Sequence, residues 1–366
     1  MKAALFCTTR YAGPAPKGVW PVPAHTYSPE IAQQSMQRTL SQFRLGDEAG
    51  FDWVTVAEHH FAPFSMSPNP LILAGALTQT IKRAKIALLG PDIPILNPVR
   101  VAEEISMLDT MSGGRVIAGL MRGTPNEYVT YNVNPAESRE RFKEAVQLIR
   151  AAWSEPQPFG WQGRFFQYRS ISIWPRPIQQ PHPPIYISAA SPESGDFAAE
   201  NRLGIGFAFT TVQMASKAAD YYRQRANEFG WTPTPDNVIY RLGMHCTDDD
   251  EEGIEDMIAA GGGQPSLGLT MTNKAIESAV AESGYYGRDI DTQRARLRSR
   301  GEVRDRIDKG QVLVGTPDTI IKQARRIKDM LGCGILDLSI AVQMGDKTLR
   351  SIEKFGTEVV PRLHEL

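Results

Sequence analysis

Two neighbouring histidines are the residues of this sequence whose type and placement most directly suggest chemistry. His59 and His60 follow an apolar run at residues 53–57, which is typical of a buried strand. Imidazole groups titrate near neutral pH, so a histidine at a strand end is suited to act as an acid, a base or a hydrogen-bond donor. Neighbouring strand residues point to opposite faces, which disfavours a metal site built from this pair. We expect one histidine to face a pocket. The alternative is that both bind loop carbonyls.

A second group of residues is suited to bind an anion. Arg122 comes just after the apolar run at 116–120, and an arginine in that position needs a carboxylate or phosphate partner. Ser191 and Ser194 lie where the apolar run at 184–188 leads into a helix, and helix amides with serine hydroxyls bind phosphate. The alternatives are a structural ion pair for the arginine and an ordinary N-cap for the serines. We expect the three residues to follow neighbouring strands on the same face, and together they favour a phosphate as the bound anion.

Alternating strands and helices must position these residues. Several of the expected strands are continuously apolar, as parallel strands buried on both faces must be. Eight strand–helix units predict an α/β fold, a closed (β/α)8 TIM barrel with insertions, rather than an open doubly wound sheet. In such a barrel the active face lies at the C-terminal ends of the strands. The expected strands are residues 3–7, 53–57, 86–89, 116–120, 184–188, 204–209, 238–245 and 335–340.

The chain is expected to form a single barrel domain over residues 1–366, with two interruptions. Residues 154–183 are rich in proline and aromatic side chains, which predicts an irregular excursion with a small hairpin around Gly163. Residues 247–311 are too long for a simple connection, and long insertions are usually functional or mobile. A lid over the barrel mouth is one interpretation of this segment, and a disordered or decorative insertion is the other.

Composition excludes several classes of protein. Lysine and arginine number 40 and aspartate and glutamate 41, a balance that argues against a general nucleic-acid binder. The three cysteines are far apart and form no C-x-x-C motif, so no disulfide framework and no metal site are indicated. No apolar run reaches the roughly 18 residues of a membrane span, so a soluble cytoplasmic protein is expected. The dinucleotide, P-loop and G-x-S-x-G motifs are absent from the sequence.

Several segments, in order along nearly the whole chain, resemble the bacterial luciferase-like flavin-dependent monooxygenases. The resemblance implies the luciferase-like TIM barrel and a homodimer formed through helices that follow the early strands. The matching segments are residues 58–61 (EHHF), 69–70, 97–104, 108–115, 139–153, 183–187 and 314–317.

The resemblance also implies roles for individual residues around a reduced FMN at the barrel mouth. His59 takes the place of the family's catalytic histidine, and His60 that of its neighbour. The phosphate is expected near Arg122, Ser191 and Ser194. The flavin ring is expected near Phe6, Leu89, Gly90, Met121 and Ala190, and the substrate pocket is expected to include Phe61, Phe64, Phe209 and Met244. Methionine at 121, alanine at 190 and phenylalanine at 209 replace a cysteine, a glutamate and a tryptophan of the luciferase α chain, which weighs against luminescence.

The function expected from the resemblance is that of a two-component monooxygenase. Reduced FMN and O2 would oxygenate a small organic substrate through a C4a-(hydro)peroxyflavin, with His59 managing the proton on that adduct. A separate NAD(P)H:flavin reductase would supply the reduced flavin, because no dinucleotide fingerprint occurs in the chain. Two alternatives stay open at this point. One is a coenzyme F420-dependent oxidoreductase that transfers hydride, and the other is a non-catalytic flavin-binding accessory protein.

Overall fold

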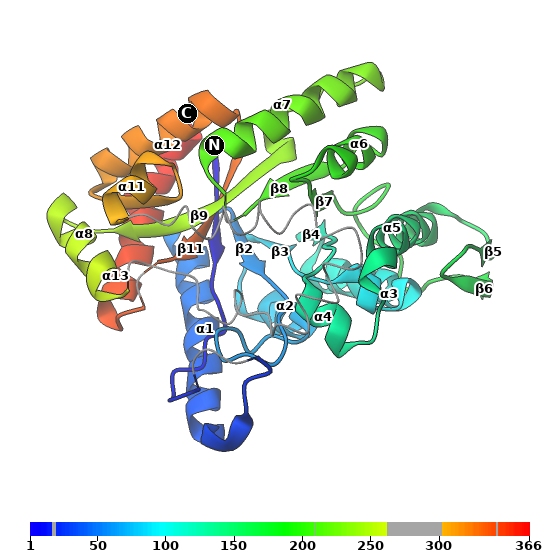
Figure 1. The fold of residues 1–366 in the computed structure, drawn as a ribbon, viewed down its shortest axis with the longest axis horizontal. Helices are drawn as coiled ribbons and strands as arrows, with labels where there is room; N and C mark the ends of the chain where they lie inside the picture. Colours follow the sequence, from blue (N-terminus) through cyan, green and yellow to red (C-terminus); the bar gives the residue numbers. More distant parts are fainter. Residues whose placement is uncertain (17–19, 209, 262–301, 342) are drawn as a thin grey trace.

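A closed barrel of parallel strands surrounded by helices forms the centre of the molecule (Figure 1). The computed structural model describes residues 1–16, 20–208, 210–261, 302–341 and 343–366. The barrel strands pair in the order β1-β2-β3-β4-β7-β8-β9-β11, and β11 closes the ring by pairing with β1. This confirms the predicted TIM barrel. The strands are β1 (Lys2–Phe6), β2 (Trp53–Val56), β3 (Lys85–Leu88), β4 (Val116–Gly119), β7 (Ile185–Ser188), β8 (Gly204–Phe207), β9 (Val238–Cys246) and β11 (Ile335–Ile340).

Local sequence signals explain where the surrounding helices begin. Five of the helices in the described part of the chain start with a Ser, Asn or Thr cap followed by proline, which is already set in the helical φ range. Three of these helices end at a glycine in the left-handed conformation, which glycine adopts without a steric clash. These glycines are Gly50, Gly113 and Gly332. The main helices are α1 (Pro29–Ala49), α2 (Pro70–Thr80), α3 (Pro98–Ser112), α5 (Ser138–Ser154), α6 (Pro192–Glu200), α7 (Val212–Glu228), α12 (Pro317–Leu331) and α13 (Asp346–Lys354).

Shorter helical segments complete the outer layer. A π-helical stretch (Phe355–Val359) joins α13 to α14 (Val360–His364), so the last predicted helix is continuous but locally wider than an α-helix. The sequence analysis did not predict α4 (Pro125–Thr130), a short helix between β4 and α5. Single 3-10 turns occur at Ala24–Thr26, Ile93–Ile95, Pro135–Glu137 and Pro235–Asn237.

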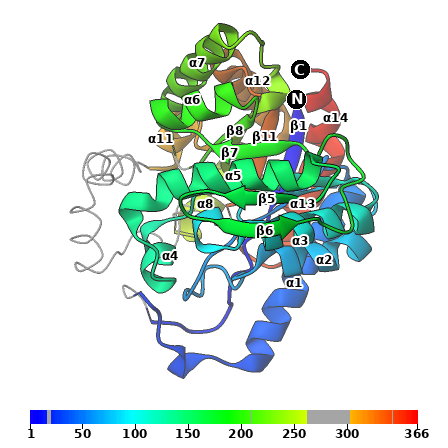
Figure 2. The same ribbon diagram turned by 90° about the vertical axis from the view of Figure 1, so that its right-hand side faces the viewer.

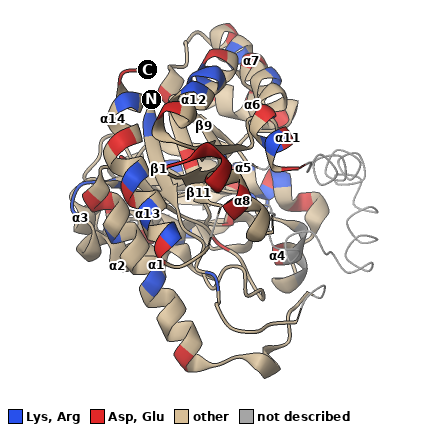
Figure 3. Ribbon diagram, turned by 90° about the vertical axis from the view of Figure 1, so that its left-hand side faces the viewer, with Lys and Arg blue, Asp and Glu red and all other residues tan. Residues whose placement is uncertain are grey.

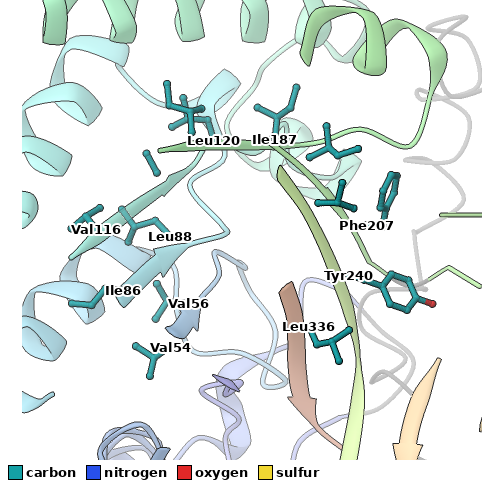
Figure 4. Close-up of a cluster of buried hydrophobic side chains, with 14 of the residues drawn as sticks. Val54, Val56, Ile86, Leu88, Val116, Leu120, Ile187, Phe207, Tyr240 and Leu336 are labelled. Atoms are coloured by element: carbon teal, nitrogen blue, oxygen red, sulfur yellow. The ribbon is translucent and has the colours of Figure 1, made fainter. Parts of the chain in front are cut away.

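The hydrophobic core lies mainly between the barrel and its helices. Apolar side chains on the outward faces of the strands pack under the helices, and Figure 4 shows part of this layer, with Val54, Leu88, Leu120 and Ile187 among the labelled residues. A smaller cluster fills the interior of the barrel: Ala4, Trp53, Ala87, Ile117, Tyr186, Ile239 and Ile335. Both faces of the sheet are therefore buried, which explains the continuously apolar strands in the sequence.

One strand of the sheet was not predicted, because it follows the long insertion and leads directly into a predicted helix start. β10 (Val312–Gly315) pairs in parallel with the outer half of β9, from Gly243 to Cys246. β8 pairs only with the first residues of β9, so β10 covers the edge that β8 leaves open. α8 (Asp250–Ala259) and α11 (Val303–Asp308) pack over β10 through a small apolar cluster. The predicted lid, residues 247–311, lies largely outside the described residues.

The predicted excursion forms a hairpin on the outside of the barrel. β5 (Phe159–Gln162) and β6 (Gln167–Ile171) pair in antiparallel fashion around Gly163, next to α5 in Figure 2. Glu144 of α5 anchors the turn, because its carboxylate accepts hydrogen bonds from the backbone of Phe165 and Phe166, both at 3.0 Å. On the side of the molecule that Figure 3 shows, acidic and basic segments alternate over the helices, in line with the balanced charge. Among the described helices, none is long and apolar enough to cross a membrane.

Candidate functional site

The ends of β2 and β3 form one side of the barrel mouth. The backbone of Gly90, just after β3, approaches residues 57 and 58 so closely that a Cβ at position 90 would lie 2.3 Å from the Ala57 Cα. This contact requires glycine and fixes the path of the chain that carries the two histidines. The backbone N–H of His59 donates to the carbonyl of Ser67 at 3.0 Å, which orients the same segment from its other side.

His60 is buried, and both of its ring nitrogens have partners. Its Nε2 lies 2.9 Å from Oε1 of Glu58, and its Nδ1 lies 3.3 Å from the hydroxyl of Tyr131. The indole N–H of Trp20 donates to the His60 carbonyl at 3.1 Å. The ring is therefore fixed in place, with 4% of the residue exposed, and it is not positioned to touch a ligand in the mouth directly.

His59 is more open and faces a different set of groups. Its side chain is 18% exposed, and its Nδ1 lies 4.0 Å from Oε1 of Glu127 on α4. Its ring lies 4.9 Å from the Phe64 ring, so the imidazole has one charged and one apolar neighbour. Oε2 of Glu127 accepts a hydrogen bond from the backbone N–H of Thr124 at 3.0 Å. Burial alone would raise the pKa of Glu127, but the contacts with His59 and Thr124 hold it below its ordinary value.

Three buried carboxyl groups surround the histidines: Glu58, Asp92 and Glu127. The backbone N–H of Asp92 donates to Oε2 of Glu58 at 3.1 Å. Burial, together with the charges of Glu58 and Glu127, raises the pKa of Asp92 well above its ordinary value, because three anions cannot share this space cheaply. Gly123 adopts a positive φ against the Asp92 carboxyl, where a Cβ would lie 2.9 Å from Cγ.

Arg122 and the two serines come to the same edge of the barrel. The N–H of Leu120 donates to the Tyr186 carbonyl at 2.9 Å, so β4 and β7 are neighbours and the residues that follow them lie side by side. Ser191 and Ser194 form a capping box at the start of α6, with hydroxyl oxygens 3.1 Å apart. The alternative prediction for these serines, an ordinary helix N-cap, is therefore confirmed.

The same edge of the barrel also carries hydrogen-bond donors that could bind a phosphate. A guanidinium, the N-terminal amides of the nine-residue helix α6 and two hydroxyls form a donor set that fits such an anion. Arg139 at the start of α5 adds a second cation nearby, bound to Glu193 of α6 at 3.2 Å. The sequence analysis did not single out this arginine. The side chain of Glu193 is the one acidic group that a phosphate at the described start of α6 would meet.

A buried ion pair lies inside the barrel below the mouth. Nε of Arg241 on β9 donates to Oδ2 of Asp337 on β11 at 2.5 Å, and the two residues are paired in the strand register. The guanidinium lies over the Phe6 ring, 3.9 Å from its centroid. The remaining polar atoms Nη2 of Arg241 and Oδ1 of Asp337 are buried without a hydrogen-bond partner in the described part of the chain. Phe6 therefore separates this pair from the mouth.

The predicted flavin and substrate residues have different surroundings in the structure. Leu89 packs against the interior cluster of the barrel, and Met121 follows β4 and bridges to Asp92. Ala190 is exposed beyond the end of β7. Phe61 is also exposed, and its backbone has a φ of 54°, an unusual conformation for a side chain of this size.

One of the predicted pocket residues faces away from the mouth, and another falls outside the described part of the chain. Met244 is buried on the outer face of β9, where its sulfur accepts a hydrogen bond from Ser351 of α13 at 3.8 Å. It faces the helices because residues of one strand alternate between the two faces. Phe209 lies outside the described residues.

Sequence reasoning missed the groups that surround the two histidines. Asp92, Glu127 and Tyr131 stand in connections rather than at strand ends, where the search for chemistry began. A local signal for Glu127 was present, because Thr124, Pro125 and Glu127 have the spacing of a helix N-cap, N1 proline and N3 glutamate. That pattern predicts α4, which carries both Glu127 and, just beyond its end, Tyr131.

Comparison with known proteins shows which family the chain resembles. A family model described as luciferase-like monooxygenase matches residues 2–332. The alkanal monooxygenase alpha chain of Photorhabdus laumondii is 27% identical over 354 residues, 93% of this chain and 96% of that protein. The oxygenase component of the flavin-dependent trigonelline monooxygenase of Acinetobacter baylyi is 28% identical over 175 residues, 47% of this chain and 48% of that protein. The match with the second relative thus spans about half of its length.

Solved structures share the fold over almost the full chain. A monooxygenase from Streptomyces bottropensis superimposes with a TM-score of 0.77 at 23% identity and covers 99% of both chains. The oxygenating constituent of 3,6-diketocamphane monooxygenase from Pseudomonas putida, solved in complex with FMN, has a TM-score of 0.73 at 19% identity over 99% of both chains. An F420-dependent secondary alcohol dehydrogenase has a TM-score of 0.70 at 18% identity, over 99% of this chain and 98% of the other. At these identities the likeness concerns the fold.

Proposed function

Since the chain belongs to the family of luciferase-like monooxygenases, we propose that it is the oxygenase component of a two-component system that uses reduced FMN and O2 to oxygenate a small organic substrate. The observation that carries this proposal is the position of His59. Its ring lies at the barrel mouth between Glu127 and Phe64, and the anion-binding edge with Arg122 belongs to the same C-terminal face. A proton-handling group and a phosphate site then face one mouth.

The donor set described above fits FMN. Arg122 and the start of α6 would hold the phosphate, while Phe6, Leu89 and Met121 would lie near the flavin ring. Bound reduced FMN would supply the reaction with O2. The chain itself would orient the ring and exclude water through the apolar residues of the mouth.

His59 is the residue of the mouth that we assign to proton transfer. Its Nδ1 lies 4.0 Å from the Glu127 carboxylate, and this contact orients the ring. With Nδ1 turned toward Glu127, Nε2 is the nitrogen that can give a proton to an oxygen atom at the mouth or take one from it. His60 supports this group without contacting the substrate, because its ring is buried and both of its nitrogens have partners.

Single-turnover kinetics test this function directly. The protein is mixed with chemically reduced FMN without oxygen, then with O2 and one of a panel of ketones, aldehydes or phenols. We expect substrate-dependent oxygenated product. His59→Ala should slow product formation by roughly a hundredfold, the usual contribution of acid–base catalysis, while the Kd for reduced FMN changes little. Unchanged single-turnover oxygenation in His59→Ala would remove this residue from the mechanism.

A parallel titration distinguishes the competing functions. The Kd values for reduced FMN and reduced F420 are compared, and each is tested for turnover. Tight binding of reduced F420 with hydride transfer and no oxygenation contradicts the proposal in favour of a dehydrogenase. Tight binding of reduced FMN without any turnover would identify an accessory flavin-binding protein instead.

We also propose that a separate NAD(P)H:flavin reductase supplies the reduced FMN. The sequence contains no dinucleotide fingerprint, and the relative from Acinetobacter is itself named an oxygenase component. Photochemically reduced FMN should therefore support oxygenation with no nicotinamide present. Oxidation of NADH or NADPH by the purified chain alone would contradict this inference.

A further inference from the structure

We propose that Tyr131 is the outer end of a proton relay through which the buried His60, held by Glu58, exchanges a proton with the barrel mouth. The role of this relay in turnover rests on the proposed oxygenase function. Its existence does not, because the relay is made only of the chain's own residues and can be tested without cofactor or substrate.

The relay is a continuous set of hydrogen bonds from the interior to an exposed side chain. Oε1 of Glu58 lies 2.9 Å from Nε2 of His60, and Nδ1 of His60 lies 3.3 Å from the hydroxyl of Tyr131. His60 is 4% exposed, whereas Tyr131 is 46% exposed. The phenol is thus the polar group that connects the buried imidazole to the surface within the described residues.

Other contacts prevent the imidazole from reaching solvent by turning. Glu58 is bound at both oxygens, by His60 and by the backbone N–H of Asp92 at 3.1 Å. The Trp20 indole holds the His60 carbonyl, and the Tyr131 ring stands edge-on to the imidazole at 5.0 Å between centroids. Among the described residues, the hydrogen bond of the His60 ring that leads to an exposed side chain is therefore the one to the Tyr131 hydroxyl.

The transfer balances as the movement of one proton. When His60 is protonated, its Nδ1–H donates to the Tyr131 oxygen while the phenol hydrogen passes to an acceptor at the mouth. His60 is then neutral, and its Nε2–H stays bound to Glu58. The reverse sequence reloads His60 from solvent, and no electrons move. The relay would supply protons beside His59, which faces the same mouth.

The charged groups around the phenol keep it in its protonated form. Burial and the charges of Glu58, Glu127 and Asp92 raise the pKa of Tyr131. These groups come from the end of β2, from α4 and from the loop after β3, so they face the relay from each element packed against it. A phenol with a raised pKa passes a proton on and does not remain as a phenolate.

Proton exchange in the cofactor-free protein is the first test. The exchange rate with water of the Nδ1–H of protonated His60 is measured by NMR on protein labelled with 15N-histidine, and His60→Gln assigns the signal. We expect Tyr131→Phe, which keeps the ring contact and removes the hydroxyl, to slow this exchange by at least about tenfold. Tyr27→Phe is the matched control, because Tyr27 is exposed and stacks on Tyr11 away from the histidines.

Exchange that is as fast in Tyr131→Phe as in the wild type and in Tyr27→Phe would overturn the relay and leave the phenol as a packing residue. Because this readout needs no turnover, it separates failure of the relay from failure of the oxygenase proposal. A structural role for Tyr131 would lower thermal stability without slowing exchange.

The second test measures the contribution of the relay to turnover. With reduced FMN, O2 and a substrate that the wild type oxygenates, Tyr131→Phe should lower kcat by at least about tenfold and change the solvent deuterium isotope effect. KM and the affinity for reduced FMN should stay as in the wild type. An unchanged kcat and isotope effect would overturn the catalytic role of the relay.

Discussion

His59 and His60 are adjacent and chemically identical, yet their surroundings assign them different tasks. One ring lies beside Glu127 at the mouth, and the other is fixed between Glu58 and Tyr131 in the interior. The alternation of side chains along a strand predicted that only one of them would face a pocket. It did not predict Glu127 and Tyr131 as partners, because these two come from a connection far away in the sequence.

Among the single residues, Glu127 is expected to affect catalysis by positioning His59. Glu127→Gln keeps the shape and much of the hydrogen bonding to Thr124 but removes the charge beside Nδ1. We expect kcat for oxygenation to fall by roughly tenfold, a barrier increase of about 1.4 kcal/mol, with little change in the Kd for reduced FMN. Glu104→Gln is the control, since that carboxylate is paired with Arg100 on the surface of α3. Equal kcat values for the two variants would show that Glu127 does not position His59.

Asp92 should make the stability of the protein depend on pH. A carboxyl whose pKa is raised in the folded state contributes stability below its unfolded pKa, and that contribution is lost as pH rises through the folded pKa. Asp92→Asn lacks this titration. As the pH rises above the ordinary pKa of an aspartate, the free energy of unfolding of the wild type should therefore fall relative to that of Asp92→Asn. Urea unfolding at several pH values measures the difference, and a constant difference would contradict a raised pKa.

Among the elements, β9 and β11 show how the barrel combines packing with charge. Their register places Arg241 directly beside Asp337, and the guanidinium covers the Phe6 ring from below. The apolar pattern predicted both strands, but an arginine and an aspartate within them gave no sign of pairing, since only the closed barrel brings their faces together. Likewise, β10 was missed because it stands between the long insertion and the start of α12, outside the regular alternation of strand and helix.

Breaking this pair on one side should be costly. Asp337→Ala leaves the guanidinium of Arg241 in the barrel interior without its partner, and removal of one member of a buried ion pair costs about 3–5 kcal/mol. Chemical denaturation should show a loss of that size. The double variant Arg241→Met with Asp337→Leu should recover most of the loss, because it removes the unpaired charge as well. A double variant no more stable than Asp337→Ala would indicate that packing, not charge, dominates here.

For the molecule as a whole, the repeat of strand and helix was enough to predict the closed barrel, because eight parallel strands with covered faces have few other solutions. The mouth was predictable only at strand ends. Glu58 belongs to the recognised EHHF segment, while Asp92 and Tyr131 acquire their roles from the way connections fold over that mouth. Sequence periodicity describes strands and helices and says little about such connections.

The exposed apolar residues of the whole molecule also predict its oligomeric state. Ile72 of α2 and Met107 and Met111 of α3 are exposed, with 74% of Ile72 accessible, and the two helices lie side by side. Large apolar side chains gathered on one face are typical of an interface, so we expect a homodimer through α2 and α3 with twice the 40.5 kDa mass of the chain. Ile72→Asp combined with Met107→Asp should give a monomer in sedimentation equilibrium. Ile258→Asp, an exposed site on α8, should leave the mass at that of the wild type, and a dimer that survives the double variant would place the interface elsewhere.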